Sequence, residues 1–325
     1  MARPRFVMEF ERPLFELEEK LNKLKSLDVS QEPHLAAEIE SLQEQIDELK
    51  ATLYTGLTPW EKVQIARHPD RPRTQDYLAA IFTDVFELRG DRAFADDKAV
   101  VCALATIGGR RVVVIGHRKG RTTKENLEAN FGMPHPEGFR KARRVMRLAE
   151  RFGLPLVTFI DTPGAYAGAD AEERGQALAI AQNLAVLAQL RTPVVTVGIG
   201  EGGSGGALAI GFGDRLLMLE NSYYSVSTPE ACASILMSDA SRAAQMAAGL
   251  GLTADDLVEL GIADEVIPEP AGGAHRDPSA VYKAVFDAVV RALDELGKWQ
   301  LEELLRAREA RLRNMGVFQE VSGDD

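Results

Sequence analysis

Leucine and isoleucine recur at three- and four-residue steps through residues 12–55, a pattern typical of amphipathic helices. The segment 28–34, which contains Pro33, interrupts the pattern and divides it into two helical runs. Two such helices joined by a short link predict an antiparallel hairpin, which we assign to residues 1–58. Each run spans only two to three heptads, so we expect its apolar seam to pack on the rest of the protein or on a partner.

Beyond the hairpin, short apolar runs alternate with helical patterns. Residues 60–73 are interpreted as a proline-containing connection into the main domain. Apolar runs at 100–107 and 111–116 flank Gly108 and Gly109, which predicts a β-hairpin. Further strands are expected at 156–160, 194–199, 216–219 and 223–226, and helices at 137–152, 172–190, from 206, from about 228, and within 278–315.

Strands that alternate with helices of about 15 residues are typical of parallel sheets joined by helical crossovers. The sequence therefore predicts an α/β fold with an N-terminal antiparallel helical hairpin and C-terminal helices. We assign residues 59–316 to the main domain and residues 317–325 to a tail.

Composition excludes several classes of protein. With 38 basic and 49 acidic side chains, the chain carries a net charge of −11, which argues against general nucleic-acid binding. Cys102 and Cys232 stand alone, so neither a disulfide framework nor a thiolate metal site is expected from this chain. Charges precede any apolar segment at the N-terminus, and no uncharged apolar stretch reaches 18 residues. We expect a cytoplasmic protein with no membrane segment.

Five glycines fall within residues 200–207, between a predicted strand and a predicted helix. Glycine allows backbone N–H groups to approach a ligand closely, and the start of a helix adds unpaired donors. This segment predicts an anion or oxyanion pocket built from backbone amides. A tight strand-to-helix connection is the plainer alternative.

Two other interpretations of this segment compete. The run 202–206 matches the Gly-x-Ser-x-Gly pattern of serine hydrolases, with Ser204 as nucleophile and His275 as the only histidine after it. A histidine in a Pro/Gly-rich loop is thin support for that triad. A phosphate-binding P-loop is excluded, because no Gly-x4-Gly-Lys-Ser/Thr string occurs.

Two further segments follow predicted strands and are candidate binding loops. Asp161-Thr-Pro-Gly-Ala-Tyr166 leaves a strand at its carboxyl end, where ligand crevices form in parallel sheets, and we single out Gly164, Ala165 and Tyr166. Another strand leads into a basic loop over 116–124, which suits a phosphate or carboxylate group but could equally face solvent. Its candidate contacts are His117, Arg118, Lys119 and Arg121.

Several long motifs resemble the carboxyltransferase α subunits of bacterial acetyl-CoA carboxylase. They are Gly-Glu-Gly-Gly-Ser-Gly-Gly-Ala-Leu-Ala-Ile-Gly at 200–211, Phe-Ile-Asp-Thr-Pro-Gly-Ala-Tyr at 159–166, Ala-Glu-Glu-Arg-Gly-Gln at 171–176, Asn-Phe-Gly-Met-Pro at 130–134, and Ile-Pro-Glu-Pro-Ala-Gly-Gly-Ala-His-Arg at 267–276. The resemblance extends from the hairpin to about residue 316.

The resemblance implies a crotonase/ClpP-like spiral of ββα units and a defined reaction. A carboxyl group would pass from carboxybiotin, carried by the biotin carboxyl carrier protein, to acetyl-CoA, forming malonyl-CoA for fatty-acid synthesis. The backbone amides of Gly205 and Gly206, with Ala207 beside them, would stabilise the negative charge on the biotin ureido oxygen. Biotin would stay on its carrier rather than on this chain.

The resemblance also implies partners. A zinc-ribbon β subunit would hold acetyl-CoA, in an α2β2 heterotetramer that works with the carrier protein and biotin carboxylase. A serine hydrolase using Ser204, and a crotonase-type isomerase or hydratase acting alone on acyl-CoA, remain the alternative functions.

Overall fold

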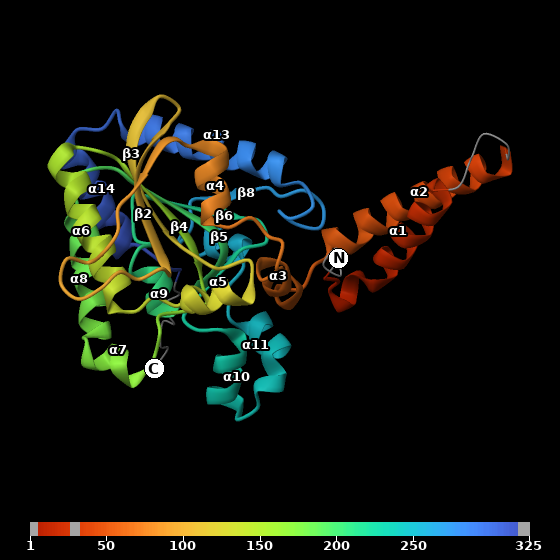
Figure 1. Cartoon of the computed structure of the whole chain (residues 1–325), viewed down its shortest axis with the longest axis horizontal. Coiled ribbons are helices and arrows are strands. Elements are labelled where there is room, and N and C mark those ends of the chain that lie inside the picture. The colour runs from red at the N-terminus through yellow and green to blue at the C-terminus, as the bar shows by residue number, and fades with distance from the viewer. Residues whose placement is uncertain (1–5, 27–32, 318–325) are drawn as a thin grey trace, which may run out of the picture.

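One mixed sheet of eight strands organises the part of the chain that the structure describes, residues 6–26 and 33–317 of a computed structural model (Figure 1). The strands, in chain order, are β1 (Thr83–Glu87), β2 (Val100–Ile107), β3 (Arg110–His117), β4 (Leu156–Thr162), β5 (Val194–Gly203), β6 (Arg215–Leu219), β7 (Tyr223–Ser225) and β8 (Glu265–Ile267).

Their order across the sheet is β1-β2-β3-β4-β5-β6-β8, and β7 pairs with the far end of β5. The pairs β1–β2 and β2–β3 are antiparallel, whereas every pair from β3 onward is parallel. The carboxyl ends of β3, β4 and β5 therefore lie side by side at the same end of the sheet. All three candidate loops of the sequence leave the sheet at that end.

Helices of very different length connect and cover the strands. They are α1 (Arg12–Lys25), α2 (Pro33–Thr55), α3 (Pro59–Ala66), α4 (Thr74–Ile81), α5 (Thr123–Glu128), α6 (Pro136–Phe152), α7 (Ala169–Glu173), α8 (Gln176–Gln189), α9 (Ser204–Leu208), α10 (Pro229–Met237), α11 (Ala243–Gly249), α12 (Ala254–Glu259), α13 (Pro278–Leu296) and α14 (Leu301–Arg313), with 3-10 turns η1 (Glu9–Glu11), η3 (Asn130–Gly132) and η4 (Ala240–Arg242).

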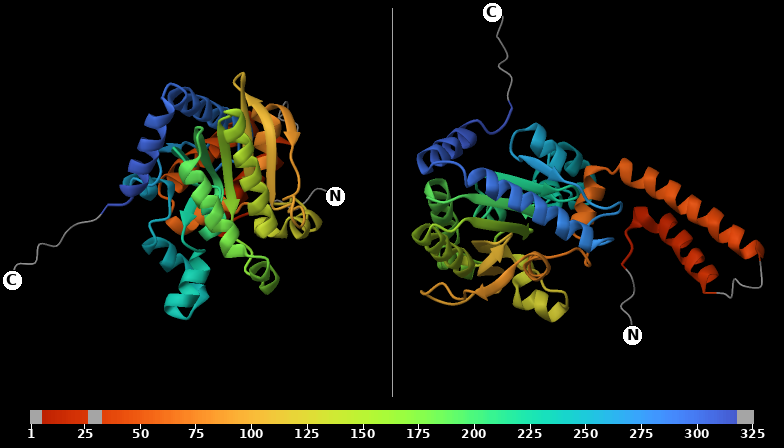
Figure 2. Two further views of the ribbon diagram at one scale, coloured as in Figure 1. Left: turned by 90° about the vertical axis from the view of Figure 1, so that its left-hand side faces the viewer. Right: turned by 90° about the horizontal axis from the view of Figure 1, so that it is seen from above.

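Both faces of the sheet are covered, so its strands are apolar on both sides. On one face, α6 and α8 bury residues such as Val145, Met146 and Leu187 against β2, β3 and β5. On the other, α4 and α13 bury Tyr77 and Val285 against the same sheet. Figures 1 and 2 show these layers, with α10 and α11 projecting below the sheet edge. This is the crotonase-type arrangement that the resemblance implies.

The N-terminal hairpin is present and stands out from the sheet domain (Figure 2). Its two helices turn their apolar seams toward each other and bury Leu14, Leu21, Leu42 and Ile46. Most of the predicted link, residues 27–32, lies outside the described residues. The two helices thus bury the apolar seam against each other, whereas we had expected the rest of the protein or a partner to bury it.

Ion pairs fasten the base of the hairpin to the main domain. Arg276 binds Glu11 at 3.1 Å and Glu18 at 3.3 Å, and the hydroxyl of Tyr54 donates to Glu11. These contacts join the hairpin to the loop that follows β8. The predicted tail lies outside the described residues, apart from Val317.

Two predicted elements differ from the structure. The connection expected at 60–73 begins in helix α3 (Pro59–Ala66), because Thr58 and Glu61 build a complete capping box around the first turn of that helix. The helix expected at 172–190 is divided at Gly175, whose φ of 82° ends α7 before α8 begins.

The glycine segment also differs from its prediction. Strand β5 continues through Gly203, and the helix that follows is the single turn α9 rather than a helix over 206–213. The ladder with β7 holds 201–203 extended, since Gly202 pairs with Tyr224.

Candidate functional site

The two glycine segments at the ends of β4 and β5 pack backbone against backbone. A Cβ atom on Gly203 would lie 2.0 Å from the carbonyl oxygen of Pro163, and one on Gly206 would lie 2.4 Å from the carbonyl carbon of Gly164. Neither position has room for a side chain. Glycine is therefore required here because the two loops approach each other closely, which in the sequence was visible only as an excess of glycine.

Helix α9 begins at this contact. In an α-helix whose N-cap is Gly203, the N–H groups through Gly206 have no acceptor within the helix, whereas Ala207 is the first that does. No side chain caps this end of the helix. Gly205 is half-buried and Gly206 is buried against the neighbouring loop. Gly205 and Gly206, the two predicted donors, are thus among the N–H groups that have no acceptor within the helix, whereas Ala207 is not.

Ser204 lies at the surface of this turn. Its φ of 52° is uncommon for a residue with a side chain, as in a strand-to-helix nucleophile turn. Among the residues that the structure describes, however, no hydrogen bond joins Ser204 to a histidine, and the ring of His275 stacks on that of His68 at 3.6 Å. The triad that a serine hydrolase needs is not assembled.

His117, at the end of β3, lies behind the glycine segment with no exposed surface. Its Nε2 atom is 3.1 Å from the carbonyl oxygen of Gly206, and its Nδ1 atom is 3.3 Å from the backbone N of Asp161. Burial, helped by the charge of Lys119, lowers the pKa of His117 to about 3. The ring is neutral at physiological pH and does not face a ligand.

Lys119 is also turned inward, and its side chain is 15% exposed. Its ammonium group bonds Asp161 at 2.6 Å and Glu201 at 2.7 Å. Glu201 in turn binds Arg67 at 2.7 Å and accepts from the hydroxyl of Tyr223. Each buried charge has an opposite partner, so the network holds the ends of β4 and β5 together. Asp161, Glu201 and Arg67 were not among the predicted site residues, although Asp161 and Glu201 lie within the quoted motifs.

Although burial works the other way, Lys119 and Arg67 hold the pKa of Glu201 down at about 2. Because this value lies below the ordinary 4.5, the ionised group stabilises the fold fully above about pH 4.5 and loses that effect as the pH falls toward 2. We expect Glu201→Gln to lower the free energy of unfolding by about 2 kcal/mol at pH 7. Its deficit relative to wild type should shrink between pH 5 and pH 2, measured by urea unfolding.

Glu309→Gln is the matched control, because Glu309 forms an exposed ion pair with Arg313. A Glu201→Gln deficit that stays constant over this pH range would contradict the assignment of the network.

The loop after β4 has a fixed shape. Thr162 donates from its hydroxyl to the carbonyl of Gly132 at 2.6 Å, and Gly164 donates its N–H to that hydroxyl. The amide of Tyr166 donates to Pro134, and its ring lies 4.5 Å from that of His135. Residues 130–134 and 161–166, two motifs of the resemblance, therefore form one wall beside the glycine segment.

Comparison with known proteins agrees with these motifs. Residues 7–316 match the family described as acetyl co-enzyme A carboxylase carboxyltransferase-like. The acetyl-coenzyme A carboxylase carboxyl transferase subunit alpha of Thermus thermophilus is 52% identical over 313 residues, 96% of this chain and 99% of that protein. The protein of the same name from Methylococcus capsulatus is also 52% identical, over 96% of this chain and 98% of that protein. The chain belongs to this carboxyltransferase family.

Solved structures share the fold at lower identity. A Pseudomonas malonate decarboxylase hetero-tetramer in complex with coenzyme A has a TM-score of 0.55 at 18% identity, covering 66% of this chain and 89% of that chain. A transcarboxylase 12S structure has a TM-score of 0.53 at 20% identity, covering 67% and 42%. These likenesses support the crotonase-type fold of this family member.

The basic loop that follows β3 differs from its expected role. His117 and Lys119 were expected to contact a substrate or carrier, but their polar atoms bond groups inside the protein. Arg118 is half-buried, and Arg121 lies at the surface, where it binds Asp76. Of these four candidate contacts, Arg121 is the exposed one.

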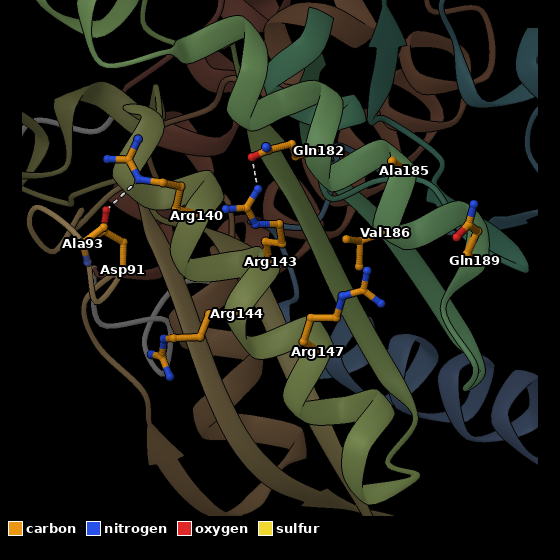
Figure 3. A pocket seen from close by; sticks show the side chains of 10 residues that line it. All are labelled: Asp91, Ala93, Arg140, Arg143, Arg144, Arg147, Gln182, Ala185, Val186 and Gln189. Carbon is orange, nitrogen blue, oxygen red and sulfur yellow. Dashed lines mark hydrogen bonds and ion pairs between the residues drawn. The ribbon is translucent and has the colours of Figure 1, made fainter.

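A second basic feature lies on α6, away from both glycine segments. Arg140, Arg143, Arg144 and Arg147 line a cavity of about 500 Å³ between α6 and α8 (Figure 3). Arg140 binds Asp91, and Arg143 bonds Gln182 across the cavity. Two of these arginines therefore help to hold α6 to its neighbours.

Among the described residues, no group of three or more His, Cys, Asp or Glu side chains is arranged to hold a metal ion, and both cysteines are buried as free thiols. Within the same residues, every helix is too short or too polar to span a bilayer.

Proposed function

We propose that this member of the carboxyltransferase family acts as the α subunit of acetyl-CoA carboxylase. In this role it transfers a carboxyl group from carboxybiotin to acetyl-CoA, which yields malonyl-CoA. Family membership over residues 7–316 and the shared name of its half-identical relatives support this activity. The roles that we assign to single residues are supported by the geometry of the site.

The start of α9 supports this assignment, since Ser204 is exposed there, Gly205 is half-buried and Gly206 is buried against the loop after β4. The N–H groups of Gly205 and Gly206 have no acceptor within this one-turn helix. Among the described residues, no histidine is hydrogen-bonded to the adjacent Ser204 to act as a catalytic base. Donors placed where negative charge develops stabilise a transition state without being reorganised. The amides of Gly205 and Gly206 would donate hydrogen bonds to the ureido oxygen of biotin as negative charge develops there, and carboxybiotin on its carrier would supply the carboxyl group.

The loop after β4 lies beside the same amides, since the backbone of Gly164 and Ala165 packs on Gly206. We assign Gly164, Ala165 and Tyr166 to positioning of the biotin ring, since all three are half-exposed beside Gly206. Arg118 and Arg121 are assigned to the approach of the carrier protein or of CoA phosphates, because guanidinium groups bind such anions well.

This chain forms only half of the proposed active site, so a partner subunit must supply the residues that bind acetyl-CoA. Apart from the contact that we assign to Arg118 and Arg121 with CoA phosphates, we assign the binding of acetyl-CoA to a zinc-ribbon β subunit in an α2β2 assembly. The biotin carboxyl carrier protein would deliver biotin, which a separate biotin carboxylase charges. A malonate decarboxylase of the same fold is likewise a hetero-tetramer.

The experiment is a carboxyl-transfer assay with carboxylated carrier protein and acetyl-CoA. We expect malonyl-CoA from this chain and the β subunit together, and none from either alone. Hydration of enoyl-CoA by the isolated chain would favour a stand-alone crotonase-type enzyme instead.

Ser204→Ala separates this function from a serine hydrolase. We expect carboxyl transfer within about threefold of wild type, because the backbone rather than the hydroxyl is used, whereas removing a catalytic serine costs on the order of 10⁶ in kcat. Labelling of Ser204 by a fluorophosphonate probe, together with loss of activity in the alanine variant, would contradict the proposal.

A further inference from the structure

His117 connects three strand ends through one ring. Its own carbonyl accepts from the hydroxyl of Thr74 at 2.6 Å, which fixes the backbone at the end of β3. Its ring reaches Asp161 at the end of β4 and Gly206 in α9, after β5. No part of the ring is exposed, so its role is exerted through these contacts.

The partners of the ring determine where its proton lies. The carbonyl of Gly206 can only accept, so the hydrogen of the neutral ring lies on Nε2, and Nδ1 is left to accept from the backbone N–H of Asp161. Nε2 donates that hydrogen to the carbonyl of Gly206. Because burial keeps the pKa of His117 near 3, this neutral tautomer holds throughout the range in which an enzyme works.

The carbonyl of Gly206 needs such a donor. Helix α9 ends after one turn: the N–H of Ala209 bonds Gly205, and the N–H of Ile210 bonds Ala207 at 3.3 Å. Neither of these two hydrogen bonds is made to the carbonyl of Gly206, which lies between the two acceptors. A buried carbonyl without a donor is unfavourable, and His117 supplies the hydrogen bond.

A one-turn helix does not hold its own position, since helices this short are unstable in isolation. Gly206 is pressed against Gly164 on one side and bonded to His117 on the other. Loss of the hydrogen bond would free the Gly206 peptide to rotate, and with it the amides at the start of α9. Misplacement of a catalytic group by about 1 Å can cost on the order of 100-fold in rate.

We propose that His117 is a positioning residue, which fixes the Gly205 and Gly206 amides in their productive orientation by donating from Nε2 to the Gly206 carbonyl. The proposal rests on the proposed function of those amides. It gives His117 no part in proton transfer and no contact with substrate.

Two conservative variants separate the two hydrogen bonds of the ring. The amide nitrogen of glutamine can reach the position of Nε2, so His117→Gln keeps the bond to Gly206. The amide oxygen of asparagine can reach the position of Nδ1, so His117→Asn keeps only the bond from Asp161. We expect kcat to fall about 100-fold in His117→Asn and less than tenfold in His117→Gln, with KM for acetyl-CoA within threefold in both.

The pH profile of His117→Gln should match wild type, since no proton moves on this ring. Thr192→Val is the matched control: Thr192 is buried and donates to the carbonyl of Leu154 at the opposite end of the sheet. We expect Thr192→Val to lower the free energy of unfolding by about as much as the His117 variants do, with kcat unchanged. Equal kcat in His117→Asn and wild type, or an equally large loss in His117→Gln, would overturn the proposal.

Amide hydrogen exchange over residues 204–207 tests the same idea without turnover. We expect at least tenfold faster exchange in His117→Asn and little change in His117→Gln. If wild type with the β subunit makes no malonyl-CoA but this exchange pattern appears, the proposed function fails and the positioning role stands. Exchange that is identical in wild type and both variants overturns the positioning role itself, and His117→Gln decides alone if the asparagine variant does not fold.

Discussion

Replacement of Gly206 by alanine is expected to lower kcat for carboxyl transfer at least 100-fold in the complex with the β subunit. The added Cβ would lie 2.4 Å from the carbonyl carbon of Gly164 and 2.5 Å from the nitrogen of Ala165. Both contacts are with backbone, so the start of α9 must move away from the neighbouring loop. One displaced oxyanion donor is typically worth about 2.7–4 kcal/mol, or 10²–10³ in kcat.

Gly205→Ala is the matched control for this result. A Cβ on Gly205 would meet only the side chain of Ile180, at 3.4 Å, and its φ is not in the left-handed region. The amide of residue 205 therefore keeps its place, and kcat should stay within about tenfold of wild type. Equal activities of the Gly206→Ala variant and wild type would exclude the backbone amides from catalysis.

Arg308→Met is expected to lower the free energy of unfolding by about 3–5 kcal/mol. Arg308, on α14, is fully buried and forms a two-point ion pair with Asp214 at 2.7 and 2.8 Å. Its remaining N–H groups donate to the carbonyls of Leu187, Leu190 and Thr192. Methionine fills much of the space but leaves a buried carboxylate and three carbonyls without their donor.

Arg313→Met, on the same helix, is the control for loss of positive charge. Arg313 pairs with Glu309 at the surface, where both side chains are more than 60% exposed, so its removal should cost less than about 1 kcal/mol. Chemical denaturation of both variants gives the comparison. Equal stability of Arg308→Met and wild type would show that α14 is not anchored through Asp214.

Periodicity was sufficient to locate the parallel strands and the long helices. The apolar runs at 156–160 and 194–199 correspond to β4 and β5, and the face of 137–152 that contains Phe139, Val145 and Met146 packs on the sheet as α6. Short elements were missed for identifiable reasons. Helix α3 is specified by its capping box rather than by its apolar pattern, and β8 has only three residues.

The candidate site was predictable where it depends on backbone and not where it depends on side-chain direction. The glycines of 200–207 indicated close approach of a backbone, and the structure has Gly203 and Gly206 against the loop after β4. The direction of His117 and Lys119 could not be inferred from a basic loop. Their partners, Asp161 and Glu201, come from strands that are far apart in the sequence and adjacent only in the sheet.

The central claim is that this chain provides half of a carboxyltransferase site. The most direct measurement is malonyl-CoA formation from carboxylated carrier protein and acetyl-CoA while a fixed amount of this chain is titrated with the β subunit. We expect no product without the β subunit and a rate that saturates at one β subunit per chain. Malonyl-CoA formed at the full rate by the chain alone, or none at saturating β subunit, would contradict the claim.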